Sequence, residues 1–142
     1  MSIHTLTLLY LIILTYLISG IEQIGVIHML KVKRLYDEKS TQDGMRILVD
    51  RVWPRGVKKE DVDYDEWYKE LAPSTELRKW FDHDTKKWDD FKKKYFKELK
   101  KQHKLLEEIK EKSDGHNVTL IYGAKDKEHN QAVAIKEYIE KS

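Results

Sequence analysis

The sequence predicts an α/β fold: a small single domain with a largely parallel sheet flanked by helices. Short apolar runs typical of buried strands alternate with longer amphipathic stretches typical of helices. The order strand, helices, strand, helix requires crossover connections, and such connections join parallel strands. With 142 residues the chain can bury one core but is too short for two full domains.

Composition limits the classes of function. Charged residues make up 37% of the chain and hydrophobic ones 40%, which indicates a packed core with a charged exterior. The net charge of +2 gives no global electrostatic reason to expect nucleic acid or an anionic membrane as partner, so any anion site must be local. Cysteine is absent, which excludes disulfides, thiolate metal centres and a thiol nucleophile. A cytoplasmic location fits this composition best.

The first 28 residues differ from the rest. No Asp, Glu, Lys or Arg occurs before Glu22, and Leu6 to Ile18 is nearly continuous apolar sequence. The run could be a signal peptide, although it lacks a basic start, or a membrane anchor that leaves the domain in the cytoplasm. We favour a third interpretation, in which Met29 is the natural start and the leader is not translated. We therefore divide the chain into an apolar leader, 1–28, and an α/β domain, 29–142.

Three segments read as strands. Leu30 to Tyr36 alternates apolar and charged residues, which is typical of a strand with one solvated face. Turn-forming residues follow from Asp37 to Gly44. Met45–Asp50 and Val118–Tyr122 are short apolar runs, which we expect at the centre of the sheet.

The sequence between the central strands predicts helices. One runs from Tyr64 to Leu71 and ends before Pro73, and Ser74 can cap the next. A long third helix starts near Asp84 or Thr85, and its apolar residues recur at three- and four-residue spacing: Trp88, Phe91, Tyr95, Leu99, Leu106 and Ile109. It can break near 102–103. A last helix is expected over 128–139, after the final strand.

One candidate binding segment leaves the first central strand. In parallel sheets, ligands lie beyond the carboxyl ends of strands, and Asp50 to Gly56 occupies such a position. Arg51 and Arg55 offer planar forks for carboxylate or phosphate, Trp53 offers an aromatic face, and Arg46 lies on the strand itself. The alternative is structural: Trp53 belongs to the core and both arginines pair with nearby carboxylates.

A second candidate segment leaves the last strand, from Tyr122 to Asn130. His129 could act as general acid or base with Asp126 as its orienting partner, while Tyr122 and Asn130 complete the site. The alternative is an ordinary helix start that Asp126 caps.

Other signals are weaker. His83 lies among carboxylates, but without a second histidine cluster the spacing predicts no metal site. The lysine-rich stretch 92–104 is a candidate nucleic-acid surface, although acidic residues share it and a solvated face is the simpler interpretation. No P-loop, dinucleotide or hydrolase-elbow motif occurs, so we expect no cofactor.

Several blocks of sequence together resemble one known family. They are Arg46-Ile47-Leu48-Val49-Asp50-Arg51-Val52-Trp53-Pro54-Arg55-Gly56, Glu70-Leu71-Ala72-Pro73-Ser74, Leu77-Arg78-Lys79-Trp80-Phe81-Asp82-His83, Tyr122-Gly123-Ala124-Lys125-Asp126 and Glu128-His129-Asn130. In this order they resemble the YeaO-like branch of domain-of-unknown-function family 488, over about 30–139. The resemblance implies a short cytoplasmic α/β protein without a settled activity. Longer members of the wider family have a cysteine motif at 122–130, so any thiol mechanism proposed for them cannot apply to this chain.

Two functional hypotheses follow. In the first, an anion such as phosphate, a nucleotide or a nucleic-acid-derived ligand is held by Arg46, Arg51 and Arg55, with Asp126, His129 and Asn130 nearest any chemistry. In the second, Trp53, Arg78, Trp80 and His83 form a non-catalytic structural or partner-binding surface. The first requires that segments 50–56, 78–83 and 126–130 surround one cleft. Whether the domain is an enzyme, and in which oligomeric state it works, stay open at this stage.

Overall fold

A computed structural model describes residues 7–14 and 29–142 of the chain. The predicted leader lies largely outside the described residues; its residues 7–14 form a helix with exposed apolar side chains. In the two described stretches, no helix is both long and apolar enough to cross a bilayer.

A four-stranded parallel sheet forms the centre of the domain. Its strands are β1 (Leu30–Arg34), β2 (Met45–Leu48), β3 (Glu66–Trp67) and β4 (Val118–Tyr122). They lie in the order β1-β4-β2-β3, and each neighbouring pair is parallel. The α/β fold and the parallel sheet predicted from the sequence are thus confirmed.

The side chains of β4 alternate between the two faces of the sheet, and each face has its own core cluster. Val118, Leu120 and Tyr122 belong to the main core cluster, which the helices cover, whereas Ile121 packs with Leu48 in a second cluster on the opposite face. Successive side chains of a strand point to opposite faces, so a strand with both sides buried must be apolar throughout. This explains why β4 reads as an uninterrupted apolar run.

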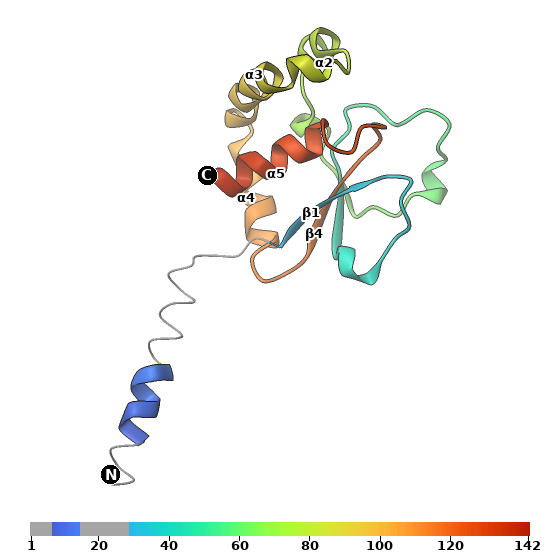
Figure 1. Ribbon diagram of the computed structural model, residues 1–142. Helices are drawn as coiled ribbons and strands as arrows, with labels where there is room; N and C mark the ends of the chain where they lie inside the picture. The colour runs from blue at the N-terminus through green and yellow to red at the C-terminus, as the bar shows by residue number, and fades with distance from the viewer. Residues whose placement is uncertain (1–6, 15–28) are drawn as a thin grey trace.

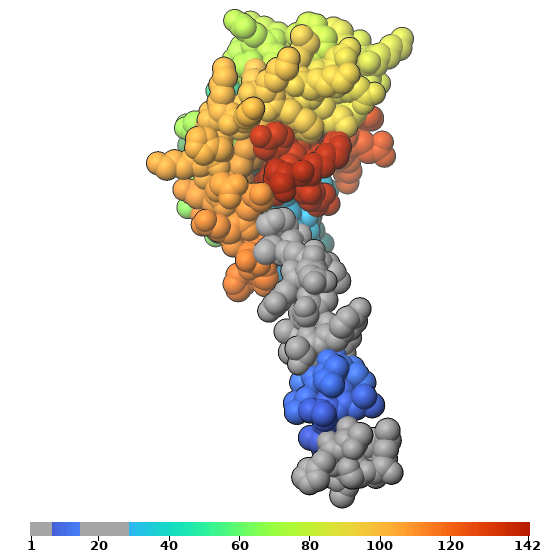
Figure 2. All heavy atoms as spheres, turned by 90° about the vertical axis from the view of Figure 1, so that its left-hand side faces the viewer, coloured from blue at the N-terminus to red at the C-terminus, as the bar shows by residue number. Residues whose placement is uncertain are grey.

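Four helices follow β3 or β4 and cover one face of the sheet (Figure 1). They are α2 (Thr75–Phe81), α3 (Trp88–Lys100), α4 (His103–Lys112) and α5 (Gln131–Lys141). The predicted break near 102–103 is confirmed, because α3 ends at Lys100 and α4 begins at His103. Figure 2 shows α3, α4 and the red α5 together on this side of the molecule.

The opposite face of the sheet is covered by the segment that leads to β3, residues 53–64, which is irregular apart from a 3-10 turn at Lys59–Asp61. The predicted helix over Tyr64 to Leu71 is wrong: this stretch holds β3 and a 3-10 turn at Lys69–Leu71. Backbone bonds to β2 override the helical pattern, since the Tyr68 amide donates to the Leu48 carbonyl at 2.9 Å. Trp67 and Tyr64 then pack on the second core cluster.

Candidate functional site

The two candidate loops meet at one edge of the sheet. Leu48 of β2 pairs with Ile121 of β4, so the loops that follow leave the same end of neighbouring strands. The Gly123 amide donates to the Asp50 carboxylate, 3.1 Å from Oδ2, and joins the loops directly. The sequence-based placement of both loops beyond the strands' carboxyl ends agrees with this geometry.

A cleft of about 220 Å³ opens at this edge. Its walls come from the three segments that the anion-binding hypothesis requires to converge, and from α3: Asp50, Arg51, Val52, Ala72, Pro73, Arg78, Phe81, His83, Phe91, Ala124, His129, Asn130 and Gln131. The volume lies below the roughly 300–1,000 Å³ usual for drug-sized ligands. A small ligand therefore fits it best.

Asp50 is the one carboxylate among the residues that line this cleft. Besides the Gly123 amide, it accepts a hydrogen bond from the side-chain amide of Gln131, at the start of α5. Burial raises the pKa of the Asp50 carboxyl to about 6, although the two amide donors and the charge of Arg78 act in the opposite direction. Asp50 thus changes protonation close to physiological pH.

Gly123 is required for this arrangement. A Cβ atom at this position would lie 2.7 Å from Asp50 Oδ2 and 3.1 Å from Pro54 Cγ. Only a residue without a side chain lets the loop after β4 approach Asp50 so closely.

Arg51 builds a wall of the cleft. Its Nε donates to the Pro73 carbonyl at 3.0 Å and its Nη2 donates to the Ala72 carbonyl at 2.8 Å. The buried Tyr95 hydroxyl donates to the preceding carbonyl, that of Leu71. Arg51 therefore holds the loop before α2, and only part of its guanidinium is left for a ligand.

Arg78 of α2 and His83 of the turn after α2 line the cleft. Arg78 is exposed, and in the part of the chain that the structure describes no hydrogen bond or ion pair joins its guanidinium to another residue. After α2 the chain takes the left-handed conformation twice, with φ of 46° at Asp82 and 56° at His83. Residues other than glycine adopt this region at a cost, and such strain is concentrated at functional sites. The turn places His83 at the cleft.

His129 enters from the loop before α5 and is oriented by Asp126. His129 Nδ1 lies 3.0 Å from Asp126 Oδ2, and the other carboxylate oxygen accepts the backbone amides of Glu128 and His129. The Glu128 amide is the main cause that lowers the pKa of Asp126, so this carboxylate is ionised. The edge of the His129 ring lies against Trp88, 5.3 Å between centroids. The predicted pair exists, but only His129 lines the cleft.

Asn130, which the sequence analysis placed in the site, has mainly a capping role. Its Oδ1 accepts from the Val133 amide at 3.0 Å and its Nδ2 donates to the Asp126 carbonyl at 2.9 Å. It caps α5, whose predicted start at 128 is therefore too early. The sequence did not identify Gln131, Phe81 or Phe91 as site residues. Residues that line a cleft have the same spacing as residues of the core or of a helix surface.

The other sequence candidates lie away from the cleft. Trp53 packs against Trp67 and Tyr64 on the opposite face, and its Nε1 donates to the Val57 carbonyl. Tyr122 is buried in the main core, and burial raises its pKa. Arg55 is exposed and does not line the cleft.

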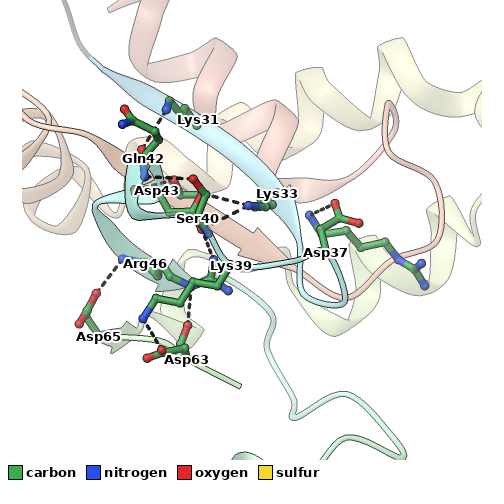
Figure 3. Close-up of polar contacts among 12 residues, drawn as sticks. Lys31, Lys33, Asp37, Lys39, Ser40, Gln42, Asp43, Arg46, Asp63 and Asp65 are labelled. Atoms are coloured by element: carbon green, nitrogen blue, oxygen red, sulfur yellow. Dashed lines mark hydrogen bonds and ion pairs between the residues drawn. The ribbon is translucent and has the colours of Figure 1, made fainter. Parts of the chain in front are cut away.

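Arg46 is 3% exposed and lies in a separate polar network (Figure 3). It forms an ion pair with the buried Asp43 and donates to the Asp63 carbonyl. Lys33 joins the same carboxylate, 3.1 Å from Asp43 Oδ1. Mutual pairing satisfies these charges, so the network ties β2 to the turn before it and leaves Arg46 out of the cleft.

Within the described residues, no group of three or more histidine and acidic side chains could hold a metal ion. His129 and Asp126 form a pair without a further ligand, and His83 has no such partner among them.

The comparisons with known proteins agree on one family. The family model described as "Inactive DUF488-N3 subclade" matches residues 29–142. "Uncharacterized protein YeaO" of Escherichia coli K12 is 40% identical over 107 residues, which cover 75% of this chain and 93% of that protein. "Uncharacterized protein Rv3073c" of Mycobacterium tuberculosis H37Rv is 44% identical over 69 residues, 49% of this chain and 58% of that protein. No solved structure matches significantly.

Proposed function

Since the chain belongs to the YeaO-like branch of the DUF488 family and matches its subclade described as inactive, we propose that it binds a small oxyanion without turning it over. The observation that carries this proposal is the convergence of Arg51, Arg78, His83 and His129 on one small cleft. Guanidinium and imidazole groups are the usual protein donors to phosphate and carboxylate.

Arg78 is the main anchor in this proposal. Arg51 is already engaged with two backbone carbonyls, whereas the guanidinium of Arg78 keeps its donors for a ligand. His83 and His129 reach the cleft from either side, which gives a bound oxyanion donors from two elements. The fork geometry of Arg78 suits two oxygens of one phosphate.

The composition of the cleft supports binding over catalysis. No Ser, Thr, Cys or Lys side chain is among the described residues that line it, so it offers no hydroxyl, thiol or amine nucleophile. Asp126 then serves to fix the orientation of the His129 ring at the cleft. If phosphate monoesters incubated with the protein released inorganic phosphate, and His129→Ala abolished that release, the domain would be an enzyme.

Titration of inorganic phosphate and nucleoside monophosphates into the full chain by calorimetry tests the proposal. Arg78→Gln should weaken binding about ten- to hundredfold, the usual range for a hydrogen bond to a charged group. Lys79→Gln is the matched control, because Lys79 is exposed on the same helix and does not line the cleft. No binding of either probe, or equal loss in both variants, would refute it.

A partner-binding surface is a second candidate function. Trp80 of α2 is 37% exposed, and the ammonium groups of Lys87 and Lys94 each lie 5.1 Å from its ring. An exposed tryptophan beside two cations suits an acidic protein surface. Trp80→Ala should then abolish capture of an acidic partner protein in a pull-down, whereas Arg78→Gln should leave that capture intact.

A cytoplasmic location is also proposed, from the absence of Cys and the charge-rich composition of the domain. Fractionation of native cells tests it, and recovery of the protein in the membrane fraction would instead support an anchoring role for the leader.

A further inference from the structure

The cleft combines one carboxylate with several cationic groups. Asp50 faces the same space as Arg51, Arg78, His83 and His129, whereas Asp126 is turned away toward the His129 ring and the backbone. A site built only to attract negative charge would have no acidic group in its wall. The presence of Asp50 therefore indicates that the ligand offers it a hydrogen-bond donor.

Asp50 cannot turn away from a ligand. Gln131 and the Gly123 amide hold its oxygens, and Oδ2 lies so near Gly123 that a Cβ atom there would be only 2.7 Å away. An ionised carboxylate only accepts hydrogen bonds, and it has about four lone-pair sites. Both known donors are amides of the protein, and acceptor capacity is left on Oδ2, which the Gly123 amide alone contacts.

Two kinds of oxyanion would behave differently beside this group. Hydrogen phosphate keeps an O–H at neutral pH and can donate it to Asp50 in a short charge-assisted bond. Sulfate has the same tetrahedral shape but no proton, so its oxygens would face the carboxylate lone pairs without a donor between them. Two like charges that face each other without a proton between them repel, and this repulsion costs binding energy.

We propose that the cleft selects an oxyanion that still carries a proton, hydrogen phosphate or a singly protonated phosphate monoester, and that Asp50 rejects sulfate. This inference rests on the proposed oxyanion-binding function and names the ligand of that site. Arg78 attracts phosphate and sulfate alike. Asp50 causes the difference in affinity between the two anions.

The selectivity depends on pH through Asp50. Because the pKa of Asp50 is about 6, its carboxyl is an acceptor at pH 7.5 and mainly a donor at pH 5. At pH 5 it can donate to a sulfate oxygen, and the preference for phosphate should decline. The other charged or titratable groups facing the cleft are Arg51, Arg78, His83 and His129, and they act on both anions. Phosphate itself gains a proton over this pH range, so the effect of Asp50 is read from the difference between wild type and Asp50→Asn.

Calorimetric titration of the full chain with inorganic phosphate and with sulfate, at pH 7.5 and pH 5, tests the inference. Wild type should bind phosphate about ten- to hundredfold more tightly at pH 7.5, and the ratio should approach one at pH 5. Asp50→Asn keeps the shape and adds an amide donor, so it should bind sulfate about as well as phosphate at both pH values. Gln131→Glu, which replaces an amide by a carboxyl next to Asp50, should weaken both anions.

The outcomes separate the two proposals. If wild type binds neither anion, the oxyanion-binding function itself fails. If it binds phosphate and sulfate equally at pH 7.5, or if folded Asp50→Asn keeps the wild-type preference, the selectivity of Asp50 is refuted while oxyanion binding stands. Should Asp50→Asn not fold, a wild-type ratio that is unchanged between pH 7.5 and 5 refutes the inference.

Discussion

At the scale of single residues, the site is held together by groups that are already paired. Arg51, Asn130 and Gln131 were candidates or neighbours of candidates for ligand contact, and each makes a hydrogen bond that shapes the cleft. Residue type and position after a strand predicted where Asp50 and His129 lie. The sequence could not show which hydrogen-bond donors are available to a ligand, because hydrogen bonding within the protein depends on residues distant in sequence.

Asp50 should make the protein's stability depend on pH. Its pKa is raised from 3.8 to about 6 on folding, so the folded state binds the proton more tightly than the unfolded state. Its contribution is therefore fully present below pH 4 and is lost as pH rises through 6, by at most about 3 kcal/mol. Denaturant unfolding between pH 4 and 8 should show this slope in the difference between wild type and Asp50→Asn.

The difference is the informative quantity, because carboxylates such as Glu137 and Asp126 have lowered pKa values and act with the opposite sign. A difference that does not change with pH would contradict the raised pKa.

Gly123→Ala should disturb both the fold and the site. The new Cβ would meet the Asp50 carboxylate and Pro54, and overpacking of this kind costs about 1–3 kcal/mol. Chemical denaturation and phosphate titration measure the two effects. In an Asp50→Ala background, Gly123→Ala should destabilise the protein less, because Asp50 Oδ2, the atom nearest to the new Cβ, is absent. Equal costs in both backgrounds would show that the approach to Asp50 is not what requires glycine.

At the scale of elements, periodicity predicted what local sequence controls and failed where distant contacts decide. The strands β1, β2 and β4 and the break between α3 and α4 follow from apolar spacing, whereas β3 was not predicted. The stretch 64–71 has helical spacing too, yet it pairs with β2, because the aromatic rings of Tyr64 and Trp67 cover a sheet face that no helix occupies. Tertiary contacts of that kind override weak local preference.

The end of α2 offers a test of stored strain. Asp82 adopts φ of 46°, a region that glycine enters without cost. Asp82→Gly should raise the free energy of unfolding by about 1 kcal/mol while phosphate affinity is retained, since Asp82 does not line the cleft. Thermal denaturation measures the gain. Asp84→Gly, at a position with φ of −85°, should instead destabilise because it removes an N-cap.

At the scale of the whole molecule, the sheet, its helices and the cleft all lie within 29–142, the range that the family model matches. Within the described ranges 7–14 and 29–142, the core clusters likewise contain no residue before Leu30. Among the described residues, the apolar side chains of 7–14 are exposed and belong to neither cluster.

A fragment of residues 29–142 should therefore fold and bind phosphate like the full chain. Its free energy of unfolding should agree with that of the full chain within about 0.5 kcal/mol, the usual range for changes away from packed features. Circular dichroism with denaturant and the phosphate titration compare the two proteins. Loss of cooperativity in the fragment would assign the leader a structural role.

The strand order has a consequence for synthesis of the protein. β4 lies between β1 and β2, and those two strands do not neighbour each other in the sheet. Leu30 pairs with Val118, so the first strand must wait for nearly the whole chain before it finds its partner. On the ribosome, α2 to α4 can form early from local contacts, while the complete sheet needs residues up to Tyr122 and the cleft needs residues up to Gln131. Until β4 is made, β1 has no partner strand in the sheet, whereas β2 can already pair with β3.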